Sequence, residues 1–402
     1  MAEKKSLEFI QKIDSPMKQV YQAFAGSVAF ESWFSDSAEA DVRKGGRFYA
    51  WWNEGDYTSG QFTKVKENER IAFTWFGFNE PAPTKVNVAF KEDEGATLVK
   101  VSHKGIGKGK VWKKTNQQIS EGWETALANL KSVVETGYDK RLYDQPMLGV
   151  LPSGMVDKKM VTEFNLPVET GAKISDVVAG MGAEAAGLQG EDIIYSIGGQ
   201  KLKTFPDFGL AMSGKKAGDV VEVVYYRGGE RLTTDMKLSG RPKPELPSSA
   251  KELAERTAKV YEEVNKEMDA LFEAVTEDQA SARPGDEEWS AKEVLAHLIY
   301  SERWLHLAIT CFIGNFRTGG FSNDLGMHAA IADAYPLEEL IAELKRCEAI
   351  TVSAIEALPE EFIADKRRLL ILTANVDEQG FALHTRGHFP QIEAALKVSK
   401  QS

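Results

Sequence analysis

The sequence predicts a multidomain protein with three folds in succession: an α+β helix-grip domain (1–137), a β-rich domain (138–242) and an all-α four-helix bundle (243–402). The first and last segments of the 402-residue chain differ in composition: six of the eight tryptophans lie in the first segment, and five of the six histidines lie in the last. The net charge of −11 also lies in the last segment. Three prolines in GRPKPELPSSA, 240–250, predict an extended linker before that segment.

Composition and charge exclude several classes of protein. Hydrophobic residues make up 43% of the chain and charged residues 27%, as in ordinary globular proteins. We expect no membrane span, because no apolar stretch approaches the roughly 20 residues that a span requires. The N-terminus lacks the apolar segment of a secretory signal, and two cysteines, Cys311 and Cys347, form no disulfide framework. We therefore expect a cytoplasmic protein, and its acidity argues against nucleic acid as a partner.

The first segment predicts a sheet closed by one long helix. Strand-like runs broken by glycine and asparagine occupy 5–13 and then 47–104. Two short helices are expected over 16–24 and 28–34. Residues 115–135 have apolar side chains at helical spacing. A curved antiparallel sheet around this helix predicts an apolar hollow between the two.

These residues also resemble a known family. The landmarks are SPMKQVYQAFAG, ESWF, GGRF, AFTW and EGWETALANL. In order and spacing they resemble the START-like (SRPBCC) superfamily, in the branch named for activators of a heat-shock chaperone ATPase. The resemblance implies a helix-grip fold with a pocket for a small hydrophobic ligand, which we expect Trp75, His103 and Trp123 to line. Plain core packing is the alternative for the aromatic residues, and a satisfied buried histidine is the alternative for His103.

The second segment has the pattern of a peptide-binding module. It contains MLGVL, then AEAAGLQGEDIIYSIGG, then two strand-like runs separated by Gly228–Gly229, which predicts a hairpin. The order of these phrases resembles a PDZ domain of the type found in bacterial HtrA proteases. Two positions depart from the pattern: Pro152 lies in the expected binding strand, and Glu191 replaces the glycine that usually precedes Asp192.

The PDZ resemblance implies a groove for the C-terminal peptide of a protein partner. The backbone N–H groups of Leu148, Gly149 and Val150 would receive the terminal carboxylate, and the following strand would pair with the peptide. Phe208 and Met212, on a helix over 205–213, would form the other wall. The alternative is that the module only spaces its neighbours, and a protease is excluded because no Ser-His-Asp domain accompanies it.

The third segment predicts four helices. Apolar residues recur at three- and four-residue spacing from 253 to 271, and Ser290 with Glu293 forms a capping box that starts a second helix. A third helix is expected over 337–358 and a fourth over roughly 376–397. Four helices with moderate loops predict an antiparallel bundle, whose core can host a metal site built from facing helices.

Histidine spacing in this segment points to such a site. His384 and His388 are four residues apart and share one helix face. His297 and His306 are nine residues apart on the second helix and point to nearly opposite faces, so only one of them can join the pair. We expect His297, because it follows Val294 on the inward stripe, whereas His306 follows a charged patch at 301–303. His328, in a loop, is a candidate to close over the site.

WSAKEVLAHL followed by HTRGHFPQ resembles the DinB-like bundle family, whose relatives include thiol-dependent S-transferases. The resemblance implies His297, His384 and His388 as metal ligands, with Gln391 as the polar residue that follows them. Pro390, which lies inside the motif, is expected to bend the fourth helix. Three imidazoles leave an open position on zinc or nickel. The alternative is a plain helical core in which these histidines bond to polar groups of the second helix.

Two functions follow from these predictions. The first is a cytoplasmic binding protein, with a stress-response or adaptor role, that combines a ligand pocket, a peptide groove and a metal site. The second is a metal-dependent thiol transferase or hydrolase that uses the three histidines. An acidic general base near the histidines would favour the enzyme, and the sequence assigns none.

Overall fold

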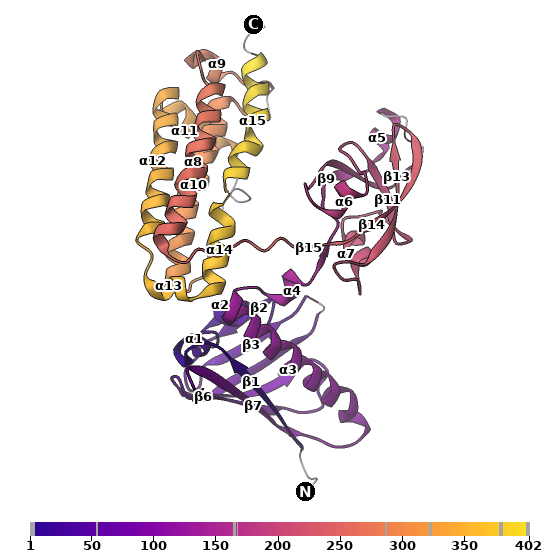
Figure 1. Ribbon diagram of the computed structural model, residues 1–402, viewed down its shortest axis with the longest axis vertical. Helices are drawn as coiled ribbons and strands as arrows, with labels where there is room; N and C mark the ends of the chain where they lie inside the picture. The colour runs from indigo at the N-terminus through magenta and orange to yellow at the C-terminus, as the bar shows by residue number, and fades with distance from the viewer. Residues whose placement is uncertain are drawn as a thin grey trace. The chain divides into compact units, whose positions relative to one another are not determined.

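The computed structural model describes residues 5–53, 55–163, 166, 168–285, 288–320, 324–377 and 381–398. The chain divides into two compact units, Met1–Gly137 with Pro244–Ser402, and Tyr138–Lys243. Three modules make up these units, as the ribbon in Figure 1 shows: a sheet with one long helix, a β-rich module and a helical module. The predicted fold class is confirmed. Within the described parts of the chain, no helix is long and apolar enough to cross a membrane.

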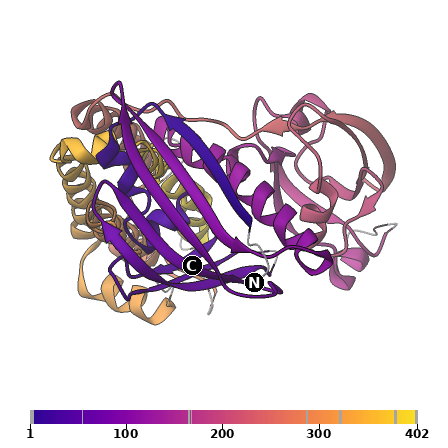
Figure 2. The ribbon, with the colours of Figure 1, turned by 90° about the horizontal axis from the view of Figure 1, so that it is seen from below.

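The first module is an antiparallel sheet of seven strands in the order β1-β7-β6-β5-β4-β3-β2, which lie side by side in Figure 2. The strands are β1 (Lys5–Ile13), β2 (Ser37–Ala40), β3 (Arg47–Trp51), β4 (Tyr57–Lys66), β5 (Arg70–Gly77), β6 (Thr84–Asp93) and β7 (Ala96–Ile106). Two short helices, α1 (Met17–Gln22) and α2 (Ser27–Glu31), separate β1 from β2. The closing helix, α3 (Lys110–Thr136), ends at Gly137, whose φ of 80° gives the left-handed C-cap that favours glycine.

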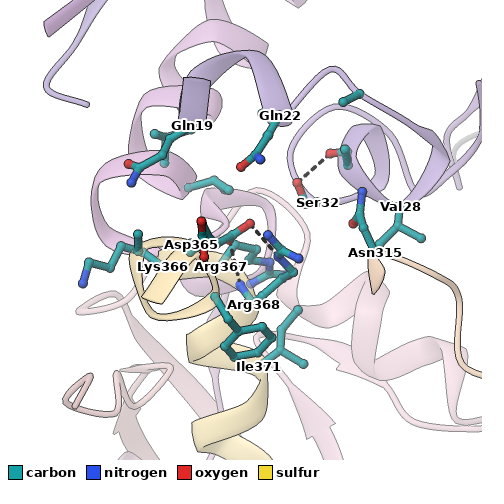
Figure 3. Close-up of a pocket in the computed structure, with 18 of the residues that line it drawn as sticks. Gln19, Gln22, Val28, Ser32, Asn315, Asp365, Lys366, Arg367, Arg368 and Ile371 are labelled. Atoms are coloured by element: carbon teal, nitrogen blue, oxygen red, sulfur yellow. Dashed lines mark hydrogen bonds and ion pairs between the residues drawn. The ribbon is translucent and has the colours of Figure 1, made fainter. Parts of the chain in front are cut away.

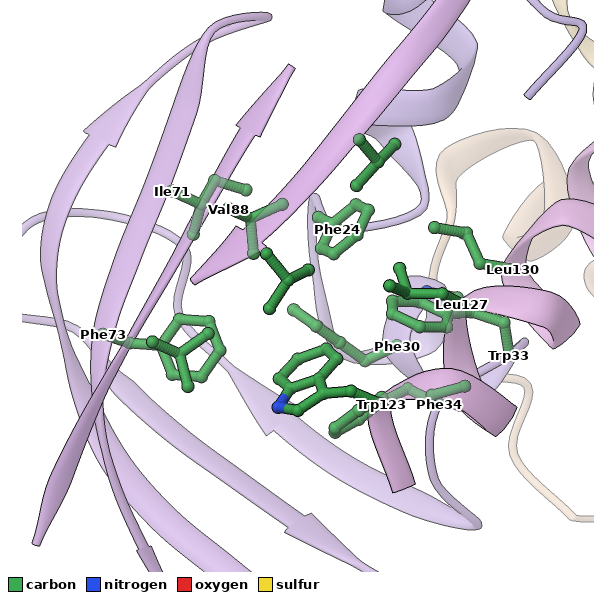
Figure 4. Packing of buried hydrophobic residues seen from close by; sticks show 14 of the residues in the cluster. Phe24, Phe30, Trp33, Phe34, Ile71, Phe73, Val88, Trp123, Leu127 and Leu130 are labelled. Atoms are coloured by element: carbon green, nitrogen blue, oxygen red, sulfur yellow. The ribbon is translucent and has the colours of Figure 1, made fainter. Parts of the chain in front are cut away.

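One aromatic core joins this sheet to α3. Trp123, Leu127 and Leu130 of α3 face Ile71 and Val88 of the sheet, as Figure 4 shows. Phenylalanine and tryptophan side chains from the segment after α1, the α2 region and the strands fill the space between the two layers. The predicted hollow is therefore occupied by the protein's own aromatic side chains in this structure.

The second module is a sheet of six strands with the path β14-β13-β11-β10-β9, and β12 pairs with β11. Its strands are β9 (Val150–Met155), β10 (Ala172–Val177), β11 (Ile193–Ile197), β12 (Gln200–Lys201), β13 (Val220–Arg227) and β14 (Glu230–Lys237). Four short helices accompany them: α4 (Lys140–Tyr143), α5 (Lys158–Glu163), α6 (Gly182–Ala185) and α7 (Pro206–Met212). The small strands β8 (Pro146–Met147) and β15 (Ser239–Gly240) pair with each other. This pairing brings the entry and exit of the module together.

The third module is helical, and its four long helices form a closed ring. The helices are α8 (Ala250–Leu271), α9 (Glu277–Ser281), α10 (Ala291–Gly314), α11 (Leu325–Ala334), α12 (Leu337–Glu356), α13 (Glu360–Ala364), α14 (Lys366–Val376) and α15 (Phe381–Val398). Both α8 and α10 pack against α12 and α15, and α11 packs against α10. The start of α14 lies beside the pocket of Figure 3, where Asp365 caps the helix and pairs with Arg368 Nε at 2.7 Å.

Three details of the helical prediction are wrong. His328 lies in α11, which begins after Asp324, whose side chain accepts a hydrogen bond from the Met327 amide. The segment before α15 forms a separate helix, α14, while α15 continues through Pro390. Ser301 and Glu302 are only 1% and 3% exposed, because they face neighbouring helices rather than solvent. The capping box that Ser290 and Glu293 form at the start of α10 is confirmed.

Candidate functional site

Three histidines from two helices meet in the core of the helical module. His297 is buried on α10, and His384 and His388 lie one turn apart on α15. The Nε2 atom of His384 is 3.1 Å from Nε2 of His297 and 3.2 Å from Nε2 of His388. One ligand atom from each of the three lies within 4.8 Å of the others. The structure thus brings together the three residues that the sequence predicts as metal ligands.

Hydrogen bonds alone do not account for this convergence. The Nε2 atom of a neutral imidazole offers one in-plane site, which is either an N–H donor or a lone pair. His384 Nε2 has two ring nitrogens at hydrogen-bond distance. A proton on His384 Nε2 can form a good hydrogen bond to only one of the two neighbouring rings. A cation at the centre accepts the lone pairs of all three rings.

The spacing also fits a metal ion. Two imidazole nitrogens, each about 2.1 Å from one ion, stand roughly 3.0 Å apart at a right angle and roughly 3.4 Å apart at a tetrahedral angle. The observed separations of 3.1 and 3.2 Å lie between these values. Burial, with repulsion from the other histidines, lowers the pKa of His297 to about 3 and that of His384 to about 4. Both rings are therefore neutral at pH 7, as metal binding requires.

Gln391 orients one of the three rings. His388 Nδ1 lies 2.9 Å from Gln391 Oε1, one turn along α15. An Nδ1–H that donates to this oxygen leaves Nε2 as a lone pair directed at the cluster. Metal-bound histidines commonly have such a partner on the other ring nitrogen. The polar residue predicted after the histidine pair is therefore placed to fix the ring of His388.

Two further residues lie against the cluster. The Trp289 ring stacks parallel to His388 at a centroid distance of 6.4 Å and lies 5.1 Å from His297. His328 lies 5.2 Å from His297 and 4.9 Å from Trp289, between centroids. Sequence reasoning missed Trp289, although it immediately precedes the capping box of α10. It indicated His328 only as a loop residue.

His306 takes no part in the cluster, as predicted. Its Nε2 lies 3.0 Å from the Cys347 carbonyl oxygen and 2.9 Å from Thr351 Oγ1, both on α12. Thr351 Oγ1 in turn donates to Glu302 Oε2 at 2.8 Å. The Tyr261 hydroxyl of α8 donates to Glu302 Oε1 at 2.9 Å. His306 thus belongs to a second polar network in the bundle core.

This network contains two buried carboxyl groups. Glu348 of α12 is 3% exposed, like Glu302 of α10, and accepts a hydrogen bond from Asn265 of α8. Burial, with repulsion from Glu302, raises the pKa of Glu348 to about 8. Burial also raises the pKa of Glu302. Sequence reasoning missed this pair because its members lie on different helices, 46 residues apart in number.

The residues predicted to line the first module's hollow also lie together. Trp75 is 5.6 Å from His103 and 6.0 Å from Trp123, between ring centroids. The Trp123 indole N–H donates to His103 Nδ1 at 3.1 Å, so His103 carries its proton on Nε2, 2.7 Å from Thr84 Oγ1. The Thr84 hydroxyl then donates to the Trp75 carbonyl oxygen. Burial lowers the pKa of His103 to about 4, which makes it a neutral and satisfied core histidine.

The residues predicted for the peptide groove surround the core of the second module. Leu148 is buried in that core, and Val150, Phe208 and Met212 pack against it half-buried. Gly149 has a φ of 79°, and a Cβ there would lie 2.4 Å from Met181 Cβ, so the position requires glycine. The Gly149 carbonyl accepts from Val178 N–H at 2.8 Å and the Leu148 carbonyl from Ala183 N–H at 3.1 Å. β9 follows at the end of the strand order, where it pairs with β10.

A buried ion pair stabilises this module. The Asp192 carboxylate is 0% exposed and receives Arg227 Nε and Nη2 at 2.7 Å each. Gln189 N–H donates to the same carboxylate. The preceding Glu191 has a φ of 72°, a left-handed conformation that favours glycine. This backbone conformation explains why the family pattern has glycine at this position, where the present chain has Glu191.

Three family models match three successive parts of the chain. Residues 14–135 match "Activator of Hsp90 ATPase homolog 1-like protein" (AHSA1), residues 146–238 match "PDZ domain" and residues 260–391 match "DinB superfamily". The chain joins an AHSA1-type, a PDZ and a DinB-type module. The predicted resemblances are confirmed, and the DinB match includes all three clustered histidines.

The curated relatives match about a third of the chain or less. "Probable periplasmic serine protease do/HhoA-like" of Haemophilus influenzae is 29% identical over 119 residues, which are 30% of this chain and 24% of that protein. "Serine protease Do-like HtrA" of Bacillus subtilis is 29% identical over 146 residues, 32% of each chain. This chain thus spans about a quarter to a third of these relatives' length.

Solved structures match about a third of the chain. An HSP90 activator from Plasmodium falciparum is 24% identical, with a TM-score of 0.28, over 32% of this chain and 94% of the other. The Aha1 dimer from Colwellia psychrerythraea is 16% identical, with a TM-score of 0.29, over 33% of this chain and 96% of the other.

Proposed function

We propose that this chain is a multidomain binding protein whose DinB-type module holds one divalent metal ion, zinc or nickel, on His297, His384 and His388. The observation that carries this proposal is the position of His384 Nε2, within 3.2 Å of two other imidazole nitrogens. A cation satisfies this arrangement, whereas a single proton does not. The match of the module to the DinB superfamily supports the same site.

The three ligands would leave a coordination position open. A bound ion would act there as a Lewis acid on a water molecule or a thiol. The chain's own contribution is to hold the three imidazoles in place, through burial at His297 and His384 and through Gln391 at His388. The open position favours a second candidate function, a metal-dependent thiol transferase or hydrolase. In the described part of the chain, the group of converging ligand atoms consists of three histidines.

Metal content and thermal stability test the site in the full-length protein. Metal at about 100 times its dissociation constant stabilises the folded state by roughly 2.7 kcal/mol. Because each kcal/mol moves the melting point of a domain this size by about 2–4 °C, we expect a rise of about 5–10 °C over the chelator-treated protein. His297→Ala, His384→Ala and His388→Ala should each remove most of the rise, and His306→Ala should retain it. A wild-type protein that holds no metal and melts identically with chelator overturns the proposal.

The other two modules support the binding role. In the PDZ module we propose a groove between β9 and α7 for a C-terminal peptide, with the Leu148–Val150 segment as its carboxylate loop. Peptides with a free apolar C-terminus should bind the full chain, and their amidated forms should not. Equal binding of both forms would exclude this groove.

In the AHSA1 module we propose that Trp75, His103 and Trp123 line a site for a small hydrophobic ligand, which enters by displacing aromatic side chains. A fluorescent fatty acid should bind the full chain, and Trp75→Glu should abolish the binding. We propose that the three modules act together as a cytoplasmic adaptor in a stress response.

A further inference from the structure

His328 is a buried histidine with no hydrogen-bond partner in the described part of the chain. Its side chain is 0% exposed, and neither Nδ1 nor Nε2 has a partner there. A buried polar group without a partner destabilises the folded state, because it has lost its hydrogen bonds to water. His306, the other histidine of the helical module outside the cluster, has hydrogen-bond partners in Cys347 and Thr351. The buried ring of His328 therefore destabilises the core unless another group binds one of its nitrogens.

The position of His328 relates it to the three clustered histidines. Its ring centroid is 5.2 Å from that of His297, at an interplanar angle of 78°. The three clustered rings stand 5.0, 4.8 and 4.8 Å apart, also edge to face. Imidazoles that bind one ion at about 2.1 Å through Nε2 have centroids roughly 5 Å apart at a tetrahedral angle. Relative to His297, His328 thus already stands at the separation of a ligand.

We propose that His328 is a displaceable fourth ligand of the ion held by His297, His384 and His388. This inference rests on the proposed metal site. With His328 bound, four imidazoles close the site in the manner of a structural metal centre, and with His328 withdrawn a position opens to a small anion such as a thiolate. His328 would therefore control access to the ion.

The surroundings of His328 permit such an exchange. The helix that carries it, α11, has 10 residues and packs against α10, which carries His297. The Trp289 ring lies 4.9 Å from His328 and 5.1 Å from His297. In the present structure the group whose ligand atoms all lie within 4.8 Å contains three histidines, without His328. Binding of the fourth ring therefore requires a rotamer change or a small displacement of α11, and the structure shows the open form.

The test is X-ray absorption spectroscopy on the full-length protein loaded with zinc alone, with the Co²⁺-substituted protein as an optical check. Four imidazoles are expected around the ion in the wild type, and three imidazoles plus one water oxygen in His328→Phe. We expect His328→Phe to bind zinc about 10–100 times more weakly than wild type. His306→Phe is the matched control, because it makes the same replacement at a histidine outside the cluster, and it should keep four imidazoles and wild-type affinity.

Each outcome decides a separate point. Wild-type protein with three imidazoles and unchanged affinity in His328→Phe overturns this inference while the three-histidine site stands. Wild-type protein that binds no zinc overturns the proposed function itself. If His328→Phe does not fold, the imidazole count of the wild type still decides between three and four ligands. Addition of a small thiol to the wild type should reduce the count from four to three, and an unchanged count would overturn the proposed displacement.

Discussion

The Nε2 atoms of His297 and His384 lie 3.1 Å apart, although these residues are 87 positions apart in the sequence. α10 contributes one ring and α15 the other, and the two helices pack against each other in the ring of four. Desolvation is the largest contribution that lowers the pKa of either ring, and repulsion from neighbouring histidines adds to it. The helical module therefore brings three imidazole nitrogens together in its core, where a cation between them would bind their lone pairs.

Gln391 should control how tightly the site binds metal. Gln391→Leu removes the acceptor for His388 Nδ1–H and frees the ring to turn. Because loss of such a partner costs roughly 10–100-fold in metal affinity, we expect that decrease in competition titrations with a chelating dye. Gln391→Glu keeps an acceptor oxygen and should retain affinity within a few-fold. Equal affinity of the Leu variant and the wild type would show that Gln391 does not orient the ring.

Glu348 should make the stability of the helical module fall as the pH rises. Its pKa of about 8 in the folded state lies above its ordinary value of 4.5, so the folded state holds a proton that the unfolded state loses. The contribution of Glu348 to stability is therefore fully present below about pH 4.5 and is lost as the pH rises through about 8, with a loss of about 1 kcal/mol between pH 7 and 9. The groups around the carboxyl are Asn265 and Asp269 of α8, Glu302 of α10 and Lys345 of α12.

Glu348→Gln removes the titrating group and should flatten this decline in chemical denaturation curves measured from pH 6.5 to 9. Glu343→Gln is the control on the same helix, because Glu343 pairs with Arg303 and has a lowered pKa. The control should decline as the wild type does. If Glu348→Gln kept the wild-type slope, the pH dependence would belong to another group.

Arg227 should be essential to the PDZ module. Arg227→Met leaves the fully buried Asp192 carboxylate without its cation, which we expect to cost about 3 kcal/mol. Hydrogen–deuterium exchange of peptides from 146–238 in the full chain measures the loss. The control is Lys173→Met, because Lys173 pairs with Glu191, whose side chain is 73% exposed, and a pair of this kind contributes about 0–1 kcal/mol. Similar losses in both variants would contradict the special role of the buried pair.

Glu191→Gly should stabilise the PDZ module. A non-glycine residue in the left-handed region destabilises the folded state by about 1–2 kcal/mol, as at Glu191. Glycine avoids this strain but loses more conformational entropy on folding, which offsets part of the gain. We therefore expect a gain of about 0.5–1 kcal/mol, read from the same exchange experiment. Glu191→Ala removes the charge but keeps the Cβ, so it should give no gain. A gain of equal size in the Ala variant would attribute the effect to charge instead.

Much of this protein follows from local sequence patterns. Strand runs, a long apolar stripe and the capping box at Ser290 depend on residues within a few positions of each other, so the three modules and most of their elements are predictable. The convergence of the three histidines is predictable because two of them share one face of a helix and His297 lies on an inward stripe. Glu191 departs visibly from the family pattern, and the structure adds the conformational reason.

The modules, their order and the three converging histidines are specified along the chain, because periodicity and spacing act on one segment at a time. Tertiary packing alone specifies what lies opposite each segment. It places Glu302 in the core beside Tyr261 and Glu348, where the sequence predicts an outward charged patch. It also places His328 on a buried helix beside His297. Burial and hydrogen bonding of these groups depend on partners from other helices, tens of residues away, and no local pattern specifies such partners.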